Sequence, residues 1–289
     1  MKILSLLRSE RRTPEWTYIA HGTIWRIEIS RSGEILGESR DQQRKVVSFF
    51  CLEGERGAPR WEDLKLEEPW WVGIESVQED TLLLHQFTQP DMPEHKRILA
   101  FDIHSGRERW RNDELTYWFG NRDKVYAYRD TFEKRIGYEL DLETGVIEQT
   151  FSENLDELRA LRTAALQDRP SGESRFPEIL DEGTQESSIA GVVQKETKGK
   201  KAAGHVEYVR EGDLLLFNYH ELGRGSSSEA PLYDNRFVIV DLQRGKRVFS
   251  EVLANGLRTP VPDSFFIRLP FVYFVKNQNT LTAIRLWKS

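Results

Sequence analysis

A short strand–turn–strand pattern recurs four times along this chain, and it constrains the fold more than any other feature. In each copy an acidic residue ends an apolar strand and stands four positions before a glycine. The carboxylate can accept backbone N–H groups inside the turn, and glycine readily adopts the positive φ that such a turn requires. The acid–glycine pairs are Asp102 and Gly106, Asp141 and Gly145, Asp241 and Gly245, and Glu53 and Gly57.

An aromatic residue follows three of these turns at one offset. Trp61, Trp110 and Phe249 each lie four residues after the glycine of their copy. We expect these rings to pack on the next unit of the chain. Four unrelated hairpins would also contain acids and glycines, but the shared spacing favours a true repeat.

The repeats divide the chain into units of four short strands. Periods of about 40–50 residues with four strands each are typical of β-propellers. We therefore predict an all-β fold, a single β-propeller domain over residues 1–289 with five four-stranded blades. The fifth unit lacks an outer strand, which the alternating segment 15–20 could supply, closing the ring and removing free sheet edges. The predicted units cover residues 23–66, 70–111, 115–151, 205–253 and 264–286.

The segment from Ala100 to Trp110, with Asp102 and Gly106 inside it, resembles the blade repeat of quinoprotein-type (PQQ-like) β-propellers, Ala-x-Asp-x-x-Thr-Gly-x-x-x-Trp. Thr144–Gly145 after Asp141 is similar to it too. The resemblance implies a propeller, with an architecture like that of WD40 proteins, and says nothing of activity. True quinoproteins of this type have more blades, and their adjacent cysteine pair is missing here. The whole chain also resembles a family of uncharacterised bacterial proteins of this general fold, which implies no catalytic residue.

Composition excludes several classes of protein. Apolar residues make up 38% and charged residues 30%, as in folded globular proteins. A net charge of −6 disfavours nucleic-acid binding. No apolar run approaches the ~18 residues of a membrane span, and the N-terminus lacks a signal-peptide pattern. The single cysteine, Cys51, lies in an apolar run and should be a buried, inert thiol. We expect a cytoplasmic monomer.

Residues 152–204 interrupt the repeat between the third and fourth blades. Leu155, Leu158, Leu161, Ala165 and Leu166 share one face of a predicted helix. Residues 171–204, rich in Ser, Gly, Glu and Lys, are predicted to form a flexible loop. Connections between blades emerge on the face that usually carries a propeller's site, so the insertion is either a lid or a tolerated surface insertion.

Catalytic motifs are absent, and the aromatic residues at the start of each unit's first strand are the main candidates for a site. They could line the mouth of a central channel and bind a sugar, a nucleobase or a peptide. The alternative is that they pack between blades, as Phe265 and Phe266 would also do. The candidates, with nearby charged residues, are Trp25, Arg26, Trp70, Trp71, Tyr117, Trp118, Glu207, Tyr208 and Arg268.

Two weaker patterns concern metals and ion pairs. His85 and His95 with Asp91 could form a metal set, but six scattered histidines make chance the better explanation, so we expect no metal and no cofactor. The pairs Arg40–Asp41 and Arg129–Asp130 each follow a unit's second strand. They are expected to brace neighbouring blades or, alternatively, to contact a substrate.

These observations favour a non-enzymatic propeller that binds an unidentified protein or small molecule, with no nucleic-acid or membrane partner. One alternative is a glycan-active hydrolase or lyase, which needs two carboxylates facing each other within ~5–9.5 Å. Another is an assembly protein that binds through the insertion. Candidate carboxylates for the enzyme are Glu28, Glu75, Asp113 and Glu207.

Overall fold

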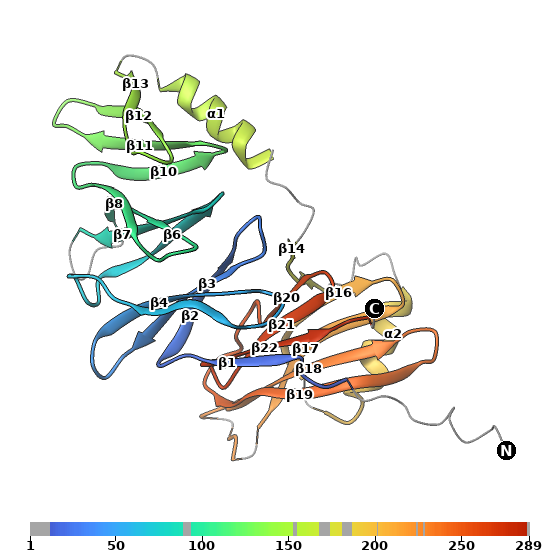
Figure 1. The fold of residues 1–289 in the computed structure, drawn as a ribbon. Coiled ribbons are helices and arrows are strands. Elements are labelled where there is room, and N and C mark those ends of the chain that lie inside the picture. Colours follow the sequence, from blue (N-terminus) through green and yellow to red (C-terminus); the bar gives the residue numbers. More distant parts are fainter. Residues whose placement is uncertain are drawn as a thin grey trace. The chain divides into compact units, whose positions relative to one another are not determined.

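The computed structural model describes residues 12–88, 94–152, 155–167, 174–180, 187–200, 202–223, 225–227 and 229–287. The chain divides into two compact units, Ala20–Pro170 and Met1–Ile19 with Ser171–Ser289. We call them the three-sheet unit and the two-sheet unit. Each is built from antiparallel sheets (Figure 1). None of the described helices is long and apolar enough to cross a membrane.

The three-sheet unit contains three four-stranded meanders, in which each strand pairs antiparallel with the next. Their order along the chain matches the first three predicted units. The first sheet is β2 (Thr23–Ile29), β3 (Ile35–Asp41), β4 (Val46–Leu52) and β5 (Pro59–Leu64); the second is β6 (Val72–Gln78), β7 (Thr81–Phe87), β8 (His95–Asp102) and β9 (Glu108–Asn112); the third is β10 (Thr116–Asn121), β11 (Lys124–Asp130), β12 (Arg135–Asp141) and β13 (Ile147–Phe151).

The two-sheet unit repeats this meander twice and adds strands at its edges. β1 (Trp16–Ile19) pairs with β22, with Trp16 opposite Ala283, so the N-terminal strand supplies the missing outer strand as predicted. Two short strands are added at sheet edges: β14 (Ser174–Arg175) pairs with β20, and β15 (Glu178–Ile179) pairs with β16. The fourth sheet is β16 (Ala202–Glu211), β17 (Leu214–Leu222), β18 (Tyr233–Asp241) and β19 (Lys246–Leu257); the fifth is β20 (Phe265–Arg268), β21 (Phe271–Lys276) and β22 (Thr280–Arg285).

The second sheet is buried on both faces because it lies between the first and the third. Leu84 packs in one apolar cluster with Phe49 of the first sheet. Its neighbour Leu83 points the other way and packs with Val125 of the third sheet. Alternation along a strand therefore fills both interfaces with apolar side chains. Cys51 belongs to the first of these clusters, and burial raises the pKa of its thiol to about 12, so it is inert at neutral pH.

A tryptophan after one glycine turn packs on the glycine turn of the next sheet. The Trp61 indole donates a hydrogen bond to the carbonyl of Ile103 (2.7 Å) and lies against Gly106. Trp110 repeats the contact one sheet further, donating to the carbonyl of Leu142 (2.9 Å) and lying against Gly145. The four repeat glycines all have positive φ: +65° at Gly57, +67° at Gly106, +69° at Gly145 and +59° at Gly245.

Alanine substitutions at these glycines should separate backbone strain from ring contact. Gly245→Ala meets no atom within 4 Å and should cost about 1–2 kcal/mol from its φ alone. Gly145→Ala should cost clearly more, because its β-carbon would lie 2.5 Å from the Trp110 ring. Urea unfolding measures both changes. In a Trp110→Leu background the excess at Gly145 should disappear; equal costs at both glycines would contradict this account.

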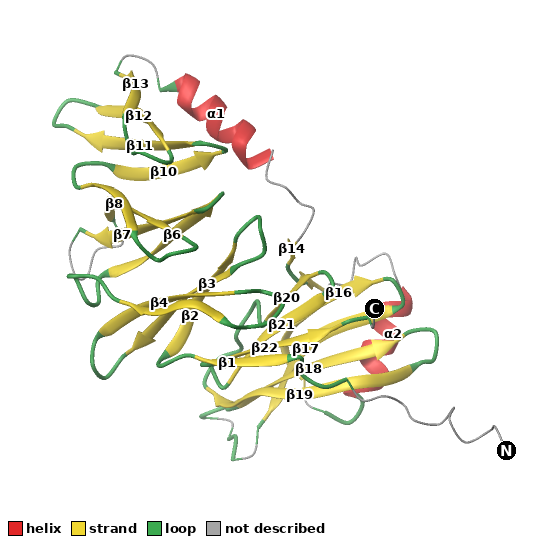
Figure 2. Ribbon diagram, viewed as in Figure 1, coloured by secondary structure: helices red, strands yellow, loops and turns green. Residues whose placement is uncertain are grey.

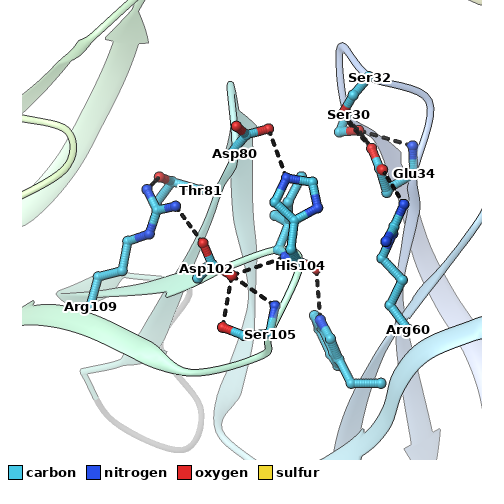
Figure 3. A network of polar contacts seen from close by, with 12 residues as sticks. Ser30, Ser32, Glu34, Arg60, Asp80, Thr81, Asp102, His104, Ser105 and Arg109 are labelled. Atoms are coloured by element: carbon cyan, nitrogen blue, oxygen red, sulfur yellow. Dashed lines mark hydrogen bonds and ion pairs between the residues drawn. The ribbon is translucent and has the colours of Figure 1, made fainter.

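A polar network surrounds the first of these contacts (Figure 3). The buried carboxylate of Glu34 accepts hydrogen bonds from Ser30 (2.7 Å), from Ser32 and from Arg60 (3.1 Å). Burial alone would raise the pKa of Glu34, but the bonds from the two serines and the charge of Arg60 lower it to about 2. In the same network Asp102 accepts the backbone N–H of Ser105 (2.7 Å), which closes the repeat turn.

The Glu34 carboxylate should make stability depend on pH. Since its folded pKa lies below the ordinary 4.5, its contribution is fully present above about pH 4.5 and is lost as the pH falls towards 2. Glu34→Gln should lower the unfolding free energy by about 1–3 kcal/mol at neutral pH. The difference from the wild type should shrink in urea titrations below pH 4.5. Glu55→Gln, at an exposed position, is the matched control. If the difference in unfolding free energy between the wild type and Glu34→Gln did not change with pH, Glu34 would not have the lowered pKa.

Two helices complete the described structure, and strands make up most of the rest (Figure 2). α1 (Asp156–Gln167) is the predicted helix, and its fully buried Leu158 packs with Phe119, Tyr126 and Phe151. Leu166, which was expected on the buried face, is 52% exposed, whereas Leu161 and Ala165 pack against the cluster as expected. The predicted capping residue Asn154 lies outside the described residues.

The prediction of a flexible loop over 171–204 is wrong for part of that segment. α2 (Ser187–Thr197) buries Ile189 and Val193 against the fourth sheet. β14 and β15 lie in the same stretch. The polar composition of this segment outweighed its one apolar pair, which is spaced one helical turn apart. Burial of that pair against β17 and β18 stabilises a helix whose own sequence favours helix only weakly.

Candidate functional site

Three adjacent strands of the second sheet bring one carboxylate and two imidazoles together. Glu75 of β6 places its Oε2 2.8 Å from Nδ1 of His95 on β8 and 3.0 Å from Nδ1 of His85 on β7. The two imidazole rings are stacked, with centroids 3.5 Å apart and planes 7° from parallel. One ligand atom from each of the three side chains lies within 4.8 Å of the others.

Irregular pairing on both sides of β7 creates this convergence. Glu75 is an extra residue in β6, because Ile74 pairs with Leu84 and Ser76 pairs with Leu83. β8 carries an extra residue opposite His85, where Arg97 has a φ of +61°. Bulges of this kind redirect a side chain and are common beside functional sites.

The site is largely enclosed. His85 is 4% exposed, while the side chains of Glu75 and His95 are 15% and 34% exposed. Phe87 packs edge-on against both imidazoles, at 5.0 and 5.3 Å, and Trp71 packs edge-on against Phe87. The Nε2 of His85 has no hydrogen-bond partner among the described residues. One side of the cluster, at His95, therefore faces solvent.

Burial and mutual charge set the protonation of the cluster. Burial would raise the pKa of Glu75, but hydrogen bonding and positive charge at His85 and His95 outweigh it and lower that pKa to about 2. Burial lowers the pKa of His85, only partly opposed by Glu75. At neutral pH the cluster therefore offers an ionised carboxylate and a neutral imidazole, the forms that bind a metal ion.

The neighbouring first sheet holds β6 in place. Arg26 donates to the carbonyls of Ile74 (2.8 Å) and Glu75 (3.3 Å). Arg40 donates to the carbonyl of Val72 (2.6 Å). The buried carboxylate of Glu38 accepts the N–H of Ile74 (2.9 Å) and also pairs with Arg40 (2.6 Å). These bonds fix the backbone on both sides of the bulge, so the carboxylate of Glu75 is presented at a defined position.

The predicted role of the Arg–Asp pairs is fulfilled only by the first of them. Arg40 braces β6 as described, although its acidic partner is Glu38 rather than Asp41. Arg129 pairs with Glu114, which lies just before β10, and Asp130 pairs with Arg135 of β12.

Several predicted channel residues of the three-sheet unit instead have packing partners. Trp70 lies under the cations of Arg40 and Lys45, at 5.1 and 4.6 Å. Tyr117 packs against the cluster between the second and third sheets. Trp118 packs edge-on against Phe119, at 6.2 Å.

Trp25 differs from these residues in its exposure. Arg40 lies above its ring too, but 63% of Trp25 is exposed. It occupies the same bulge position in β2 that Glu75 holds in β6 and Trp118 holds in β10. The three sheets thus repeat one irregularity. Only the second sheet uses it to present an acid.

The predicted residues of the two-sheet unit lie on covered sheet edges. Ser174 of β14 pairs with Arg268, and Glu178 and Ile179 of β15 pair with Tyr208 and Glu207. The two short strands of the insertion, β14 and β15, therefore lie along the first strands of the fifth and fourth sheets. Phe265 and Phe266 are buried and pack with Phe237 and Tyr273.

The carboxylates proposed for a glycan-active enzyme do not form facing pairs in the described three-sheet unit. Glu28 is paired with Arg26 (2.8 Å) and Asp113 with Arg97 (3.3 Å). Glu75 faces two histidines instead of a second acid. Each of these three carboxylates is thus engaged by a basic group and does not face another acid.

Sequence reasoning considered His85 and His95 together with Asp91 but attributed the set to chance, and it named Glu75 only as a candidate carboxylate of a glycan-active enzyme. Asp91, the proposed third ligand, lies outside the described residues. Glu75 is ten residues before His85 and reaches it only because a bulge turns its side chain. Pairing of neighbouring strands brings His85 and His95 together, and the sequence contains no spacing rule for that.

Gly73, opposite His85 in the pairing of β6 and β7, should be sensitive to substitution. A β-carbon there would lie 3.1 Å from the imidazole Cε1 and 3.2 Å from Oε2 of Glu38. Because both groups are buried, Gly73→Ala should destabilise the protein by about 1–3 kcal/mol in urea unfolding. Gly191→Ala in α2 meets nothing within 4 Å and should instead stabilise by up to about 1 kcal/mol. A neutral Gly73→Ala would show that His85 is free to move.

Comparison with known proteins adds a family match over part of the chain. Residues 29–110 match the family described as Domain of unknown function (DUF4905). The matched segment contains Glu75, His85 and His95, so the whole candidate site lies inside it. No curated protein sequence matches the chain significantly.

Solved structures show only distant likeness. A europium-containing methanol dehydrogenase is 12% identical with a TM-score of 0.32, and the match covers 94% of this chain but 52% of that one, so this chain spans about half its length. A DUF4221 family member from Bacteroides vulgatus is 7% identical with a TM-score of 0.35, over 96% and 98% of the two chains. The Dos1 propeller is 8% identical with a TM-score of 0.30, over 92% and 68%. Scores at this level support no argument about function.

Proposed function

We propose that this chain is a non-enzymatic binding protein that holds a divalent transition metal, Zn²⁺ above all, through Glu75, His85 and His95. The observation that carries the proposal is the convergence of the three side chains from adjacent strands. Zn²⁺ favours imidazole nitrogen and carboxylate oxygen, and a set of two histidines and one acid is a common three-ligand arrangement.

The metal would take the place of the proton between Glu75 and His95. Zn–N bonds are about 2.0–2.1 Å long. The stacked rings would therefore splay slightly so that both Nδ1 lone pairs point at one ion. Three protein ligands leave a fourth position open on the exposed side of His95. That position would accept an oxygen or nitrogen atom of a bound ligand or partner protein.

The architecture we propose around this site is a closed five-bladed propeller of the quinoprotein-repeat type. Five sheets share one strand order, and β1 completes the fifth as its outer strand. The repeated contact of tryptophan with a glycine turn is how one blade would dock on the next. An acidic chain with a single buried thiol suits a monomer in a reducing cytoplasm.

Calorimetric titration with Zn²⁺ tests the proposal. The wild-type chain should bind one equivalent, and a chelator should lower its melting temperature. Glu75→Gln and His85→Ala should each weaken binding at least about 10-fold, as is usual for lost metal ligands. Affinity should fall as the pH is lowered, because protons compete with the metal ion for the imidazoles.

His104→Ala is the matched control. His104 lies in the turn of the same sheet and is exposed, and its imidazole pairs with Asp80 (3.4 Å) (Figure 3). Its loss should leave Zn²⁺ affinity unchanged. Wild-type protein that binds no Zn²⁺, or binds it equally well without Glu75, would disprove the metal site.

A further inference from the structure

A second polar cluster lies inside the two-sheet unit, on one face of the fourth sheet. Glu207 of β16 pairs with Asn218 of β17, and His220 of β17 pairs with Asn235 of β18. All four side chains are buried, with exposures of 7%, 0%, 3% and 3% in chain order. We call these residues the Glu207 cluster. The opposite face of β17 is apolar, since Phe217 there packs against α2.

Each side chain of the Glu207 cluster has one polar atom without a hydrogen-bond partner among the described residues. These atoms are Oε2 of Glu207, Oδ1 of Asn218, Oδ1 of Asn235 and Nδ1 of His220. Leaving a buried polar atom unpaired costs about 1–3 kcal/mol. Four such atoms on adjoining residues therefore indicate that something binds there.

The remaining polar atoms of the cluster are held by the loop before β20. The Nδ2 groups of Asn218 and Asn235 both donate to the hydroxyl oxygen of Ser264, at 3.4 and 2.7 Å. The Asn218 side chain also hydrogen-bonds to the carboxylate of Glu207, whereas the carboxamide oxygens of Asn218 and Asn235 have no partner among the described residues.

Two backbone groups of the same loop fix the acid and the imidazole. Asp263 donates its N–H to Oε1 of Glu207 (3.2 Å), and Val261 donates its N–H to Nε2 of His220 (3.1 Å). Since Nε2 accepts, the proton of a neutral His220 lies on Nδ1, which is therefore a donor. The unpartnered set is thus three oxygen acceptors and one N–H donor.

Charge around the cluster is also unbalanced. No ion pair joins Glu207 to a lysine or arginine in the part of the chain that the structure describes. Burial is the main cause that raises the pKa of Glu207, and the negative charge of Asp263 adds to it. A cation placed here would relieve both the missing charge and the missing hydrogen bonds.

We propose that the Glu207 cluster binds a hard cation, of which Ca²⁺ is the best probe, through the free oxygens of Glu207, Asn218 and Asn235. Ca²⁺ prefers carboxylate and carboxamide oxygens and takes about 6–8 ligands, so water completes its shell. The Nδ1–H of His220 donates to one of these waters. This site and the Glu75 site lie in different units, and this site offers oxygen rather than nitrogen ligands. Each proposal can therefore be tested independently of the other.

Titration of the full chain with Ca²⁺, followed by calorimetry and thermal unfolding, tests the site. One ion should bind, and the melting temperature should rise by ~3 °C or more at saturating Ca²⁺. Glu207→Gln should weaken binding at least 10-fold while leaving the melting temperature without Ca²⁺ equal or higher. Asn235→Asp adds a charged ligand, so it should strengthen binding and lower the melting temperature without Ca²⁺.

Glu251→Gln is the matched control, because Glu251 lies in the same sheet but is paired with Lys276 (2.9 Å). It should bind Ca²⁺ as the wild type does, and so should Glu75→Gln, which removes only the other site. If the wild type shows no binding at millimolar Ca²⁺, or if Glu207→Gln binds equally well, the cluster holds only water and the proposal is overturned.

Discussion

The contact between a tryptophan and the glycine turn of the next sheet is the interaction on which the described three-sheet unit depends. It combines a large ring that is buried at Trp110 and partly buried at Trp61, a hydrogen bond from the indole to a turn carbonyl, and a backbone position that a β-carbon would fill. Because the same contact occurs at Trp61 and at Trp110, each sheet is docked on its neighbour in the same orientation. Apolar side chains such as Leu83 and Leu84 then fill both interfaces of the middle sheet.

This docking is what makes a site in the second sheet possible. A sheet held on both faces can tolerate bulges in two of its strand pairs, since neighbouring sheets fix the displaced backbone. Arg26, Arg40 and Glu38 bind β6 on either side of Glu75. The resulting arrangement holds an ionised acid against a buried neutral imidazole whose Nε2 has no hydrogen-bond partner among the described residues. A metal ion is the group that the donor set fits best.

Much of the fold followed from local chemistry. The acid–glycine spacing predicted four turns, and the division into strands predicted the five sheets and the pairing of β1 with the last one. These features are local because each turn depends on a few consecutive residues. The helix α2 escaped prediction for the opposite reason: its buried residues Ile189 and Val193 are stabilised by strands distant in the sequence. The polar composition of the segment led to the prediction of a loop, because the two apolar residues of the helix are too few to change that composition.

The sequence alone determined that this chain forms short antiparallel strands in repeated units, since alternation and turn residues act within a few positions. Tertiary structure alone decided which polar residues meet. Glu75, His85 and His95 come from three strands, and their meeting depends on two bulges whose cost is repaid only by neighbouring sheets. The same holds for Glu207, Asn218, His220 and Asn235, which strand register brings onto neighbouring positions of one sheet. Register and bulges depend on contacts over long sequence separations, so no local pattern can predict them.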